Sequence, residues 1–236
     1  GVVGGGGGHA VAGRRGGHDE SPEKIGHRDR VVVVGDLELG CDQAGARERP
    51  GKDVVGMVEI EYNEKWNPNV FRYFIYRNFL LNFTSTIKSD FVTDVSDVVV
   101  ARNPFEAFLF QENRNTLFCG DEPKTLDNDW MNDHSTHLRN QISDYVEYEK
   151  KFAESTLLNC GIIGGSTDVM NEFLKELCFV HEHFNSNNET AYTCDMGAFN
   201  YIARTQFNER LIHGAPVNSI FKGYEGARMD CWFRHK

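Results

Sequence analysis

The sequence predicts an α/β domain in which helices flank a mostly parallel central sheet. Short apolar or β-branched runs alternate with longer helical stretches along most of the chain, and this alternation is typical of strand–helix–strand units. Hydrophobic residues make up 40% of the 236 residues and include 17 phenylalanines, which suffices for one sizeable core. No run approaches the ~20 consecutive apolar residues of a membrane-spanning helix.

The first residues of the chain differ in composition from the rest. The stretch 1–30 is rich in glycine and charge and has almost no large apolar residue, so it cannot bury enough surface to offset the entropy of ordering it. We therefore expect residues 1–30 to form a disordered, low-complexity tail and residues 31–236 to form the folded domain. The glycine run is not a phosphate-binding loop, because no strand precedes it and no Lys-Ser/Thr follows it.

Each predicted element follows from a local pattern. Short apolar or β-branched runs predict strands over 30–36, 54–61, 89–94, 115–122, 156–166, 211–213 and 219–222. Longer stretches with apolar residues at helical spacing predict helices over 67–83, 137–155, 167–183 and 195–204. Pro68 suits the first turn of the first helix, and Ser166 suits the N-cap of the third. The first helix is expected to place Phe71, Phe74, Ile75 and Asn78 on one face.

Charge and cysteine spacing exclude some classes of protein. The formal net charge of −10 argues against a general nucleic-acid binder, because contacts to phosphates need a basic surface. None of the six cysteines forms a C-x-x-C pair, which argues against a zinc ribbon or a thioredoxin-like motif. Two sequons, at Asn82 and Asn188, permit glycosylation in a secretory pathway.

Two acids stand where an apolar strand is expected to end. Asp94 closes the run that begins at Phe91, and Asp97 follows three residues later. Ligands of open α/β sheets bind beyond the carboxyl ends of strands, and two carboxylates there suit Mg²⁺ or Mn²⁺ holding a diphosphate. The alternative is a solvated turn in which Asp94 or Ser96 caps a short helix.

The stretch 89–105 resembles the metal-binding core of glycosyltransferases with the GT-A fold, in particular the glycogenin-like and plant cell-wall enzymes. In those families an apolar strand leads into Asp-x-Asp and a second apolar run, and Asn103-Pro104-Phe105 is similar to the segment that follows. Here the acids are spaced Asp-x-x-Asp. The helical stretch FRYFIYRNFL is similar to the helix that carries a donor-contacting basic residue, for which Arg77 is the better match and Arg72 the second.

Two downstream stretches extend the resemblance. LLNCGIIGGS is similar to the central strand and turn where small residues let the sugar donor or acceptor approach the backbone. This implies ligand-binding roles, assigned to the donor, for Asn159, Gly161, Gly164 and Gly165; the alternative for the glycines is an ordinary strand-to-helix turn. CDMGAFN is similar to the acidic segment near the acceptor. It implies catalytic roles for Asp195 and Asn200, while Asp195 could also be a plain helix N-terminal acid.

The C-terminal residues CWFRHK resemble the end of glycogenin-like domains, where a histidine completes the metal shell and a lysine contacts the diphosphate. The resemblance implies His235 as a third metal ligand and Lys236 as a phosphate contact, and the alternative is a frayed terminus. Lys222 is a further phosphate candidate. His134 and His137 have a spacing compatible with metal binding but lie in a polar stretch, and we leave them outside the predicted site.

Together these resemblances imply a metal-dependent hexosyl- or pentosyltransferase that retains anomeric configuration. Its cofactor would be Mn²⁺ or Mg²⁺, its donor a nucleotide-diphosphate sugar, and its acceptor a glycan, a protein or a small molecule. The expected compartment is the Golgi or secretory pathway, with membrane contact only through an anchor before Gly1, and the cytoplasm is the alternative. The rival hypotheses are a haloacid-dehalogenase-type phosphohydrolase and a catalytically silent GT-A-like binding scaffold.

Overall fold

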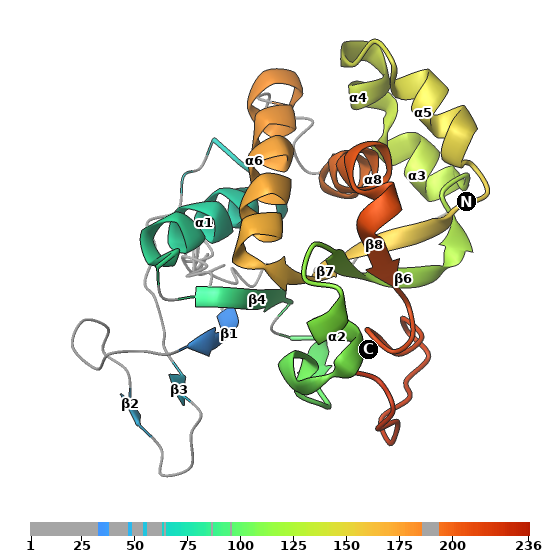
Figure 1. The fold of residues 1–236 in the computed structure, drawn as a ribbon. Coiled ribbons are helices and arrows are strands. Elements are labelled where there is room, and N and C mark those ends of the chain that lie inside the picture. The colour runs from blue at the N-terminus through green and yellow to red at the C-terminus, as the bar shows by residue number, and fades with distance from the viewer. Residues whose placement is uncertain are drawn as a thin grey trace, which may run out of the picture.

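The computed structural model describes residues 63, 65–85, 87–94, 96–185 and 194–236, together with the backbone of three short strands (Figure 1). These strands are β1 (Val33–Leu37), β2 (Arg47–Glu48) and β3 (Val54–Val55). The predicted tail 1–30, most of the predicted strand 54–61 and the sequon at Asn188 lie outside the described residues. Among the described residues, no helix is both long and apolar enough to cross a membrane.

A five-stranded mixed sheet forms the centre of the domain. Its strands lie in the order β1, β4 (Ile87–Thr93), β7 (Thr156–Ser166), β6 (Leu117–Thr125) and β8 (Leu211–His213). The β6–β8 pair is parallel, whereas β1–β4, β4–β7 and β7–β6 are antiparallel. The α/β class is therefore confirmed, and the prediction of a mostly parallel sheet is wrong.

The insertion of β7 explains this error. Strands β4 and β6 run in the same direction, as strand–helix–strand units would predict, but β7 lies between them and runs the opposite way. All the interior residues of β7 are buried. Helices cover one face of the sheet, and the C-terminal segment (residues 214–236) covers the other. The sequence of a strand that is buried on both faces is a continuous apolar run, and a strand of a parallel sheet has the same pattern.

Three helices cover one face of the sheet: α1 (Pro68–Phe83), α6 (Thr167–Phe184) and α8 (Asp195–Gln206) (Figure 1). As predicted, Pro68 lies in the first turn of α1, and the Ser166 side chain accepts a hydrogen bond from the Val169 N–H at the start of α6. The predicted face of α1 is wrong, since the buried residues are Val70, Tyr73, Tyr76 and Leu80. The aromatic residues of α1 itself are spread over most of its faces, so its hydrophobic pattern does not select a single face.

Shorter helices connect β6 to β7. They are α3 (Asp129–His134), α4 (Thr136–Gln141) and α5 (Tyr145–Phe152). The single helix predicted over 137–155 is therefore wrong: the chain leaves the helical conformation at Ile142, which is extended, and starts again at Tyr145. The remaining short helices are η1 (Pro104–Glu106), α2 (Phe108–Glu112) and η2 (Asn208–Arg210).

The C-terminal segment covers the second face of the sheet, beside α2 and opposite α6 (Figure 1). Its last residues form β9 (Phe233–His235), which pairs antiparallel with β5 (Val98–Val100). A second aromatic cluster fills the space between this segment and the sheet, and consists of Phe91, Phe110, Phe118, Ile162, Val217, Trp232 and Phe233. The strand predicted at 219–222 is absent, because the chain there makes only an isolated bridge at Asn218 and then turns.

Candidate metal centre

Three potential metal ligands from distant parts of the chain meet at one end of β4. Asp94, Asp97 and His235 each offer one ligand atom, and these atoms lie within 4.8 Å of one another. His235 is 2% exposed and belongs to a strand, so the alternative of a frayed terminus is wrong. The structure thus brings together the three residues that the sequence analysis assigned to a metal.

Backbone hydrogen bonds hold each of the three residues in place. The Asp94 N–H donates to the carbonyl of Gly161 on β7, with an N···O distance of 2.9 Å. The His235 N–H donates to Ser219 Oγ at 2.9 Å, and the Lys236 N–H donates to the Asp97 carbonyl at 2.9 Å. The ribbon formed by β5 and β9, in which Val98 pairs with His235, therefore fixes Asp97 and His235 beside the end of β4.

The chemistry of these residues fits a divalent cation. Asp97 Oδ1 and His235 Nδ1 are buried and have no hydrogen-bond partner among the described residues, which is costly unless another group engages them. Burial lowers the pKa of His235, although Asp97 and Asp94 oppose the effect, so the imidazole is neutral at pH 7. Neutral imidazole is the form that binds metals, and two carboxylates with one imidazole suit Mn²⁺.

Gly161 lies beside two of the three ligands, Asp94 and His235, where a side chain would not fit. A Cβ at this position would lie 2.8 Å from Asp94 Oδ2, 2.9 Å from Asn159 Oδ1 and 2.9 Å from His235 Cε1. Real Cβ atoms essentially never approach other atoms so closely, so at least one of these three side chains would have to shift. The absence of a side chain at Gly161 is therefore what lets Asp94 and His235 close over β7.

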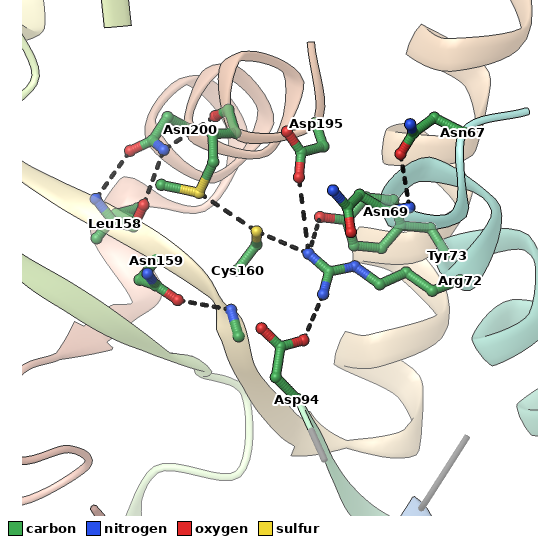
Figure 2. Close-up of polar contacts among 12 residues, drawn as sticks. Asn67, Asn69, Arg72, Tyr73, Asp94, Leu158, Asn159, Cys160, Asp195 and Asn200 are labelled. Atoms are coloured by element: carbon green, nitrogen blue, oxygen red, sulfur yellow. Dashed lines mark hydrogen bonds and ion pairs between the residues drawn. The ribbon is translucent and has the colours of Figure 1, made fainter. Parts of the chain in front are cut away.

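Arg72 of α1 connects the metal cluster to a second acid (Figure 2). Its Nη1 donates to Asp94 Oδ1 at 2.5 Å, and its Nη2 lies 3.8 Å from Asp195 Oδ2. Nη2 also donates to Cys160 Sγ at 2.9 Å. Because Arg72 occupies Oδ1 of Asp94, the other oxygen, Oδ2, remains directed toward Gly161 and His235. The arginine thus orients the carboxylate and holds Asp195 beside it.

A polar cavity of about 270 Å³ opens beside Asp94. Asp195 lines it from the first turn of α8 and is 8% exposed. Burial raises the pKa of Asp195, and the nearby Arg72 opposes that rise. Asn159 lines the cavity from β7, and its Oδ1 accepts from the Gly161 N–H at 2.7 Å (Figure 2). Its Nδ2 donates to Glu122 Oε1 at 2.9 Å. The cavity wall thus combines the guanidinium group of Arg72 with several carboxylate and amide oxygens that can accept hydrogen bonds.

Four of the helix and strand residues assigned to the site from the sequence lie outside it. Arg77 lies near Cys178 of α6, so Arg72 occupies the position expected for Arg77. A Cβ on Gly164 would lie 2.1 Å from the ring of Phe91, and one on Gly165 would lie 3.0 Å from the Thr116 carbonyl. Both glycines therefore serve packing within the sheet.

Asn200 is the fourth of these residues, and its role is structural. It is fully buried; its Oδ1 accepts from the Leu158 N–H, and its Nδ2 donates to the Leu158 and Met196 carbonyls, all at 3.0 Å (Figure 2). These bonds attach α8 to β7, so the catalytic role predicted for Asn200 gives way to a structural one. Asp195, one helical turn away, does reach the cavity.

The two predicted phosphate-contacting lysines differ in position. Lys236 lines a second cavity, of about 290 Å³, which His235 also lines. The Lys222 side chain is exposed and lies over the ring of Phe221, with Nζ 5.1 Å from its centroid. Phe221 in turn packs against His235, with centroids 4.6 Å apart. Only Lys236 therefore borders the candidate centre directly.

Sequence reasoning missed several residues of the cavity wall, notably Glu122, Trp130 and Cys160. Glu122 had a usable signal, because it ends the predicted strand 115–122 just as Asp94 ends the predicted strand 89–94. His134 also lines the cavity, although the sequence analysis set it aside. Trp130 and Cys160 carried no local signal.

Comparison with known proteins does not identify a family. No protein-family model matches the chain, and no curated protein is significantly similar to it.

Proposed function

We propose that the protein is a metal-dependent glycosyltransferase that uses a nucleotide-diphosphate sugar. The observation that carries the proposal is the convergence of Asp94, Asp97 and His235, with Arg72 joining Asp94 to Asp195. The resemblance of the stretch 89–105 to the GT-A metal motif is the reason for proposing sugar transfer as the reaction. Mn²⁺ or Mg²⁺ bound there would stabilise the negative charge of a departing nucleoside diphosphate.

The residues around the centre take distinct roles in this proposal. Arg72 orients Asp94 and stabilises negative charge beside the ligand atoms. Asp195 faces the same cavity and accepts hydrogen bonds from sugar hydroxyls, while Asn159 and Glu122, which also line it, supply further acceptors. Lys236, which follows His235 and is bonded through its N–H to the Asp97 carbonyl, neutralises phosphate charge. The glycogenin-like resemblance extends the proposal to retention of anomeric configuration, which NMR of the product measures directly.

A thermal-shift screen tests the proposal. UDP- and GDP-sugars are added with and without Mn²⁺, and we expect stabilisation only when both are present. A ligand at about one hundred times its Kd stabilises by ~2.7 kcal/mol, which raises the Tm of a domain of this size by roughly 5–10 °C. Asp94→Asn and Asp97→Asn should abolish the shift.

Glu154→Gln is a matched control, because it removes one negative charge from an exposed side chain outside the site. It should keep the full thermal shift. Equal shifts in wild type, Asp94→Asn and Asp97→Asn would refute the proposed site. Metal-dependent release of phosphate from an aryl phosphate, without any response to nucleotide sugars, would favour the phosphohydrolase.

A further inference from the structure

Trp130 has an unusual position for a tryptophan. It lies on α3 and lines the same cavity as Asp94 and Asp195. The chain has three tryptophans, of which Trp66 is 5% and Trp232 3% exposed, whereas Trp130 is 43% exposed. A large aromatic side chain that stays exposed at the wall of a polar cavity is a common feature of ligand sites.

His134 holds the indole ring of Trp130 in one orientation. The two rings are stacked, with centroids 3.7 Å apart and planes 24° from parallel. His134 Nδ1 also lies 2.7 Å from the Trp130 carbonyl oxygen, at hydrogen-bond distance. Because the imidazole covers one face of the indole and is itself anchored to the helix, the ring system is a preorganised platform.

The surroundings of this platform favour a polyhydroxylated ligand. Glu122, Asp195 and Asn159 line the cavity with oxygen acceptors, which match the hydroxyl groups on the rim of a sugar ring. The C–H groups on the face of a pyranose, in turn, pack well on an indole. A cavity of about 270 Å³ lies near the lower end of the usual range for ligand pockets, which suits a single sugar unit.

We propose that Trp130, held by His134, is the stacking platform for the sugar ring of the acceptor. The acceptor is therefore a glycoside or a glycan end, and its pyranose packs on Trp130 with its hydroxyls toward Asp195 and Glu122. That the bound sugar acts as acceptor rests on the proposed transferase function. That a sugar binds at Trp130 rests on the cavity alone.

Acrylamide quenching of tryptophan fluorescence tests the binding site without any donor. Trp130 supplies most of the quenchable signal, because the other two tryptophans are buried. Methyl α- and β-glycosides of glucose, galactose, xylose and arabinose are titrated at millimolar concentrations. Uridine is titrated in parallel to test whether a nucleoside binds at Trp130 instead. We expect at least one glycoside to shield Trp130 and uridine to leave the quenching unchanged. Shielding by uridine alone, or by no compound, would overturn the proposal.

Saturation-transfer NMR with the shielding glycoside extends the test to variants that lack the indole. Trp130→Ala should lose the transfer signal, and His134→Ala should weaken it. Phe179→Ala is the matched control: Phe179 on α6 is 46% exposed and is stacked on His183 in the same way, with centroids 3.9 Å apart, but it lies outside the cavity. An unchanged signal in Trp130→Ala, or an equal loss in Phe179→Ala, would overturn the proposal.

Kinetics separate this inference from the function on which its acceptor role rests. With a nucleotide sugar that gives a Mn²⁺-dependent thermal shift, Trp130→Ala should raise KM for the glycoside about tenfold, equivalent to ~1.4 kcal/mol. The shift caused by donor and Mn²⁺ should stay at the wild-type value. An unchanged KM with an intact shift would refute the acceptor role. If a glycoside shields Trp130 but no nucleotide sugar with Mn²⁺ gives a thermal shift, the proposed transferase function is refuted and the sugar-binding site at Trp130 is supported.

Discussion

Gly161 is the position where a single methyl group should damage the metal centre most. In Gly161→Ala the new Cβ meets Asp94 Oδ2, Asn159 Oδ1 and His235 Cε1 at less than 3.0 Å, so Asp94 and His235 must separate. We expect Mn²⁺ affinity, measured by calorimetry, to fall at least about tenfold and stability to fall by about 1–3 kcal/mol. Gly120→Ala on the neighbouring strand is the control, because its Cβ makes no contact shorter than 3.4 Å. Equal Mn²⁺ affinity in both variants would show that the ligands do not close over Gly161.

Asp90 should make stability depend on pH through a group that lies outside the candidate site. It is fully buried in β4, and neither of its carboxylate oxygens has a hydrogen-bond partner among the described residues. Burial raises its pKa from an ordinary 3.8 to about 8, so the native protein keeps a proton that the unfolded chain releases above pH ~4. The contribution to stability is therefore complete below pH ~4 and is lost as the pH rises toward ~8.

Urea unfolding at about pH 5 and about pH 8 measures this effect, which we expect to be on the order of 3 kcal/mol. Asp90→Asn cannot ionise and should lose most of that difference between the two pH values. Asp133→Asn changes an exposed aspartate of α3 and should behave as wild type. If Asp90→Asn keeps the wild-type slope, Asp90 does not carry a raised pKa.

At the scale of elements, the attachment of α8 to β7 depends on Asn200. Asn200→Ala leaves the N–H and the carbonyl of Leu158 without their side-chain partner inside the core, so we expect a loss on the order of 3 kcal/mol in urea unfolding. Asn140→Ala removes an exposed amide of α4 and should cost much less. A variant with unchanged stability but lost transfer activity would restore the catalytic role that the sequence suggested for Asn200.

Most elements were predictable because their signals are local. The β-branched run before Asp94, the capping Ser166 and Pro68 in the first turn each act through neighbours a few residues away, and the structure confirms the elements they mark. Strand direction was not predictable, because the sequence of β7 contains no signal for the direction of β4 and β6. The buried face of α1 was mispredicted for a related reason: Tyr73 and Phe74 are both large aromatic residues, and the packing of α1 against α6 decides which one is buried.

The candidate site was predictable to the extent that its residues lie at element ends. Asp94 and Asp195 stand where a strand ends and where a helix begins, and both reach the cavity. Arg72 and Arg77 lie on one helix but point to different sides, so the choice between them depended on the face of α1. The partnership of Asp97 with His235 depends on the β5–β9 ribbon, whose pairing joins segments too far apart for a local pattern to indicate.

At the scale of the whole molecule, the candidate centre joins two parts of the domain. Asp94 directly follows β4 of the central sheet, whereas Asp97 directly precedes β5 and His235 is the last residue of β9. The C-terminal segment is also held by the Trp232 N–H, which donates to the Pro216 carbonyl at 2.7 Å, and by the Ala101 N–H, which donates to the Trp232 carbonyl at 2.7 Å. A cation bound by all three ligands would therefore link the ribbon to the sheet and reduce its local opening.

Hydrogen exchange measured by mass spectrometry tests this coupling. We expect Mn²⁺ to slow exchange of the amides in β5 and β9 by about tenfold, equivalent to ~1.4 kcal/mol of opening free energy. Because the chain carries a formal net charge of −10, cations also gather on it without a specific site, so NaCl at equal ionic strength is needed as a control. Helix α5, which contributes no residue to the centre, should be unaffected, and Asp97→Asn should lose the protection in β9. Uniform slowing over α5 and β9 would instead indicate diffuse cation binding, because only a specific site can protect the ribbon selectively.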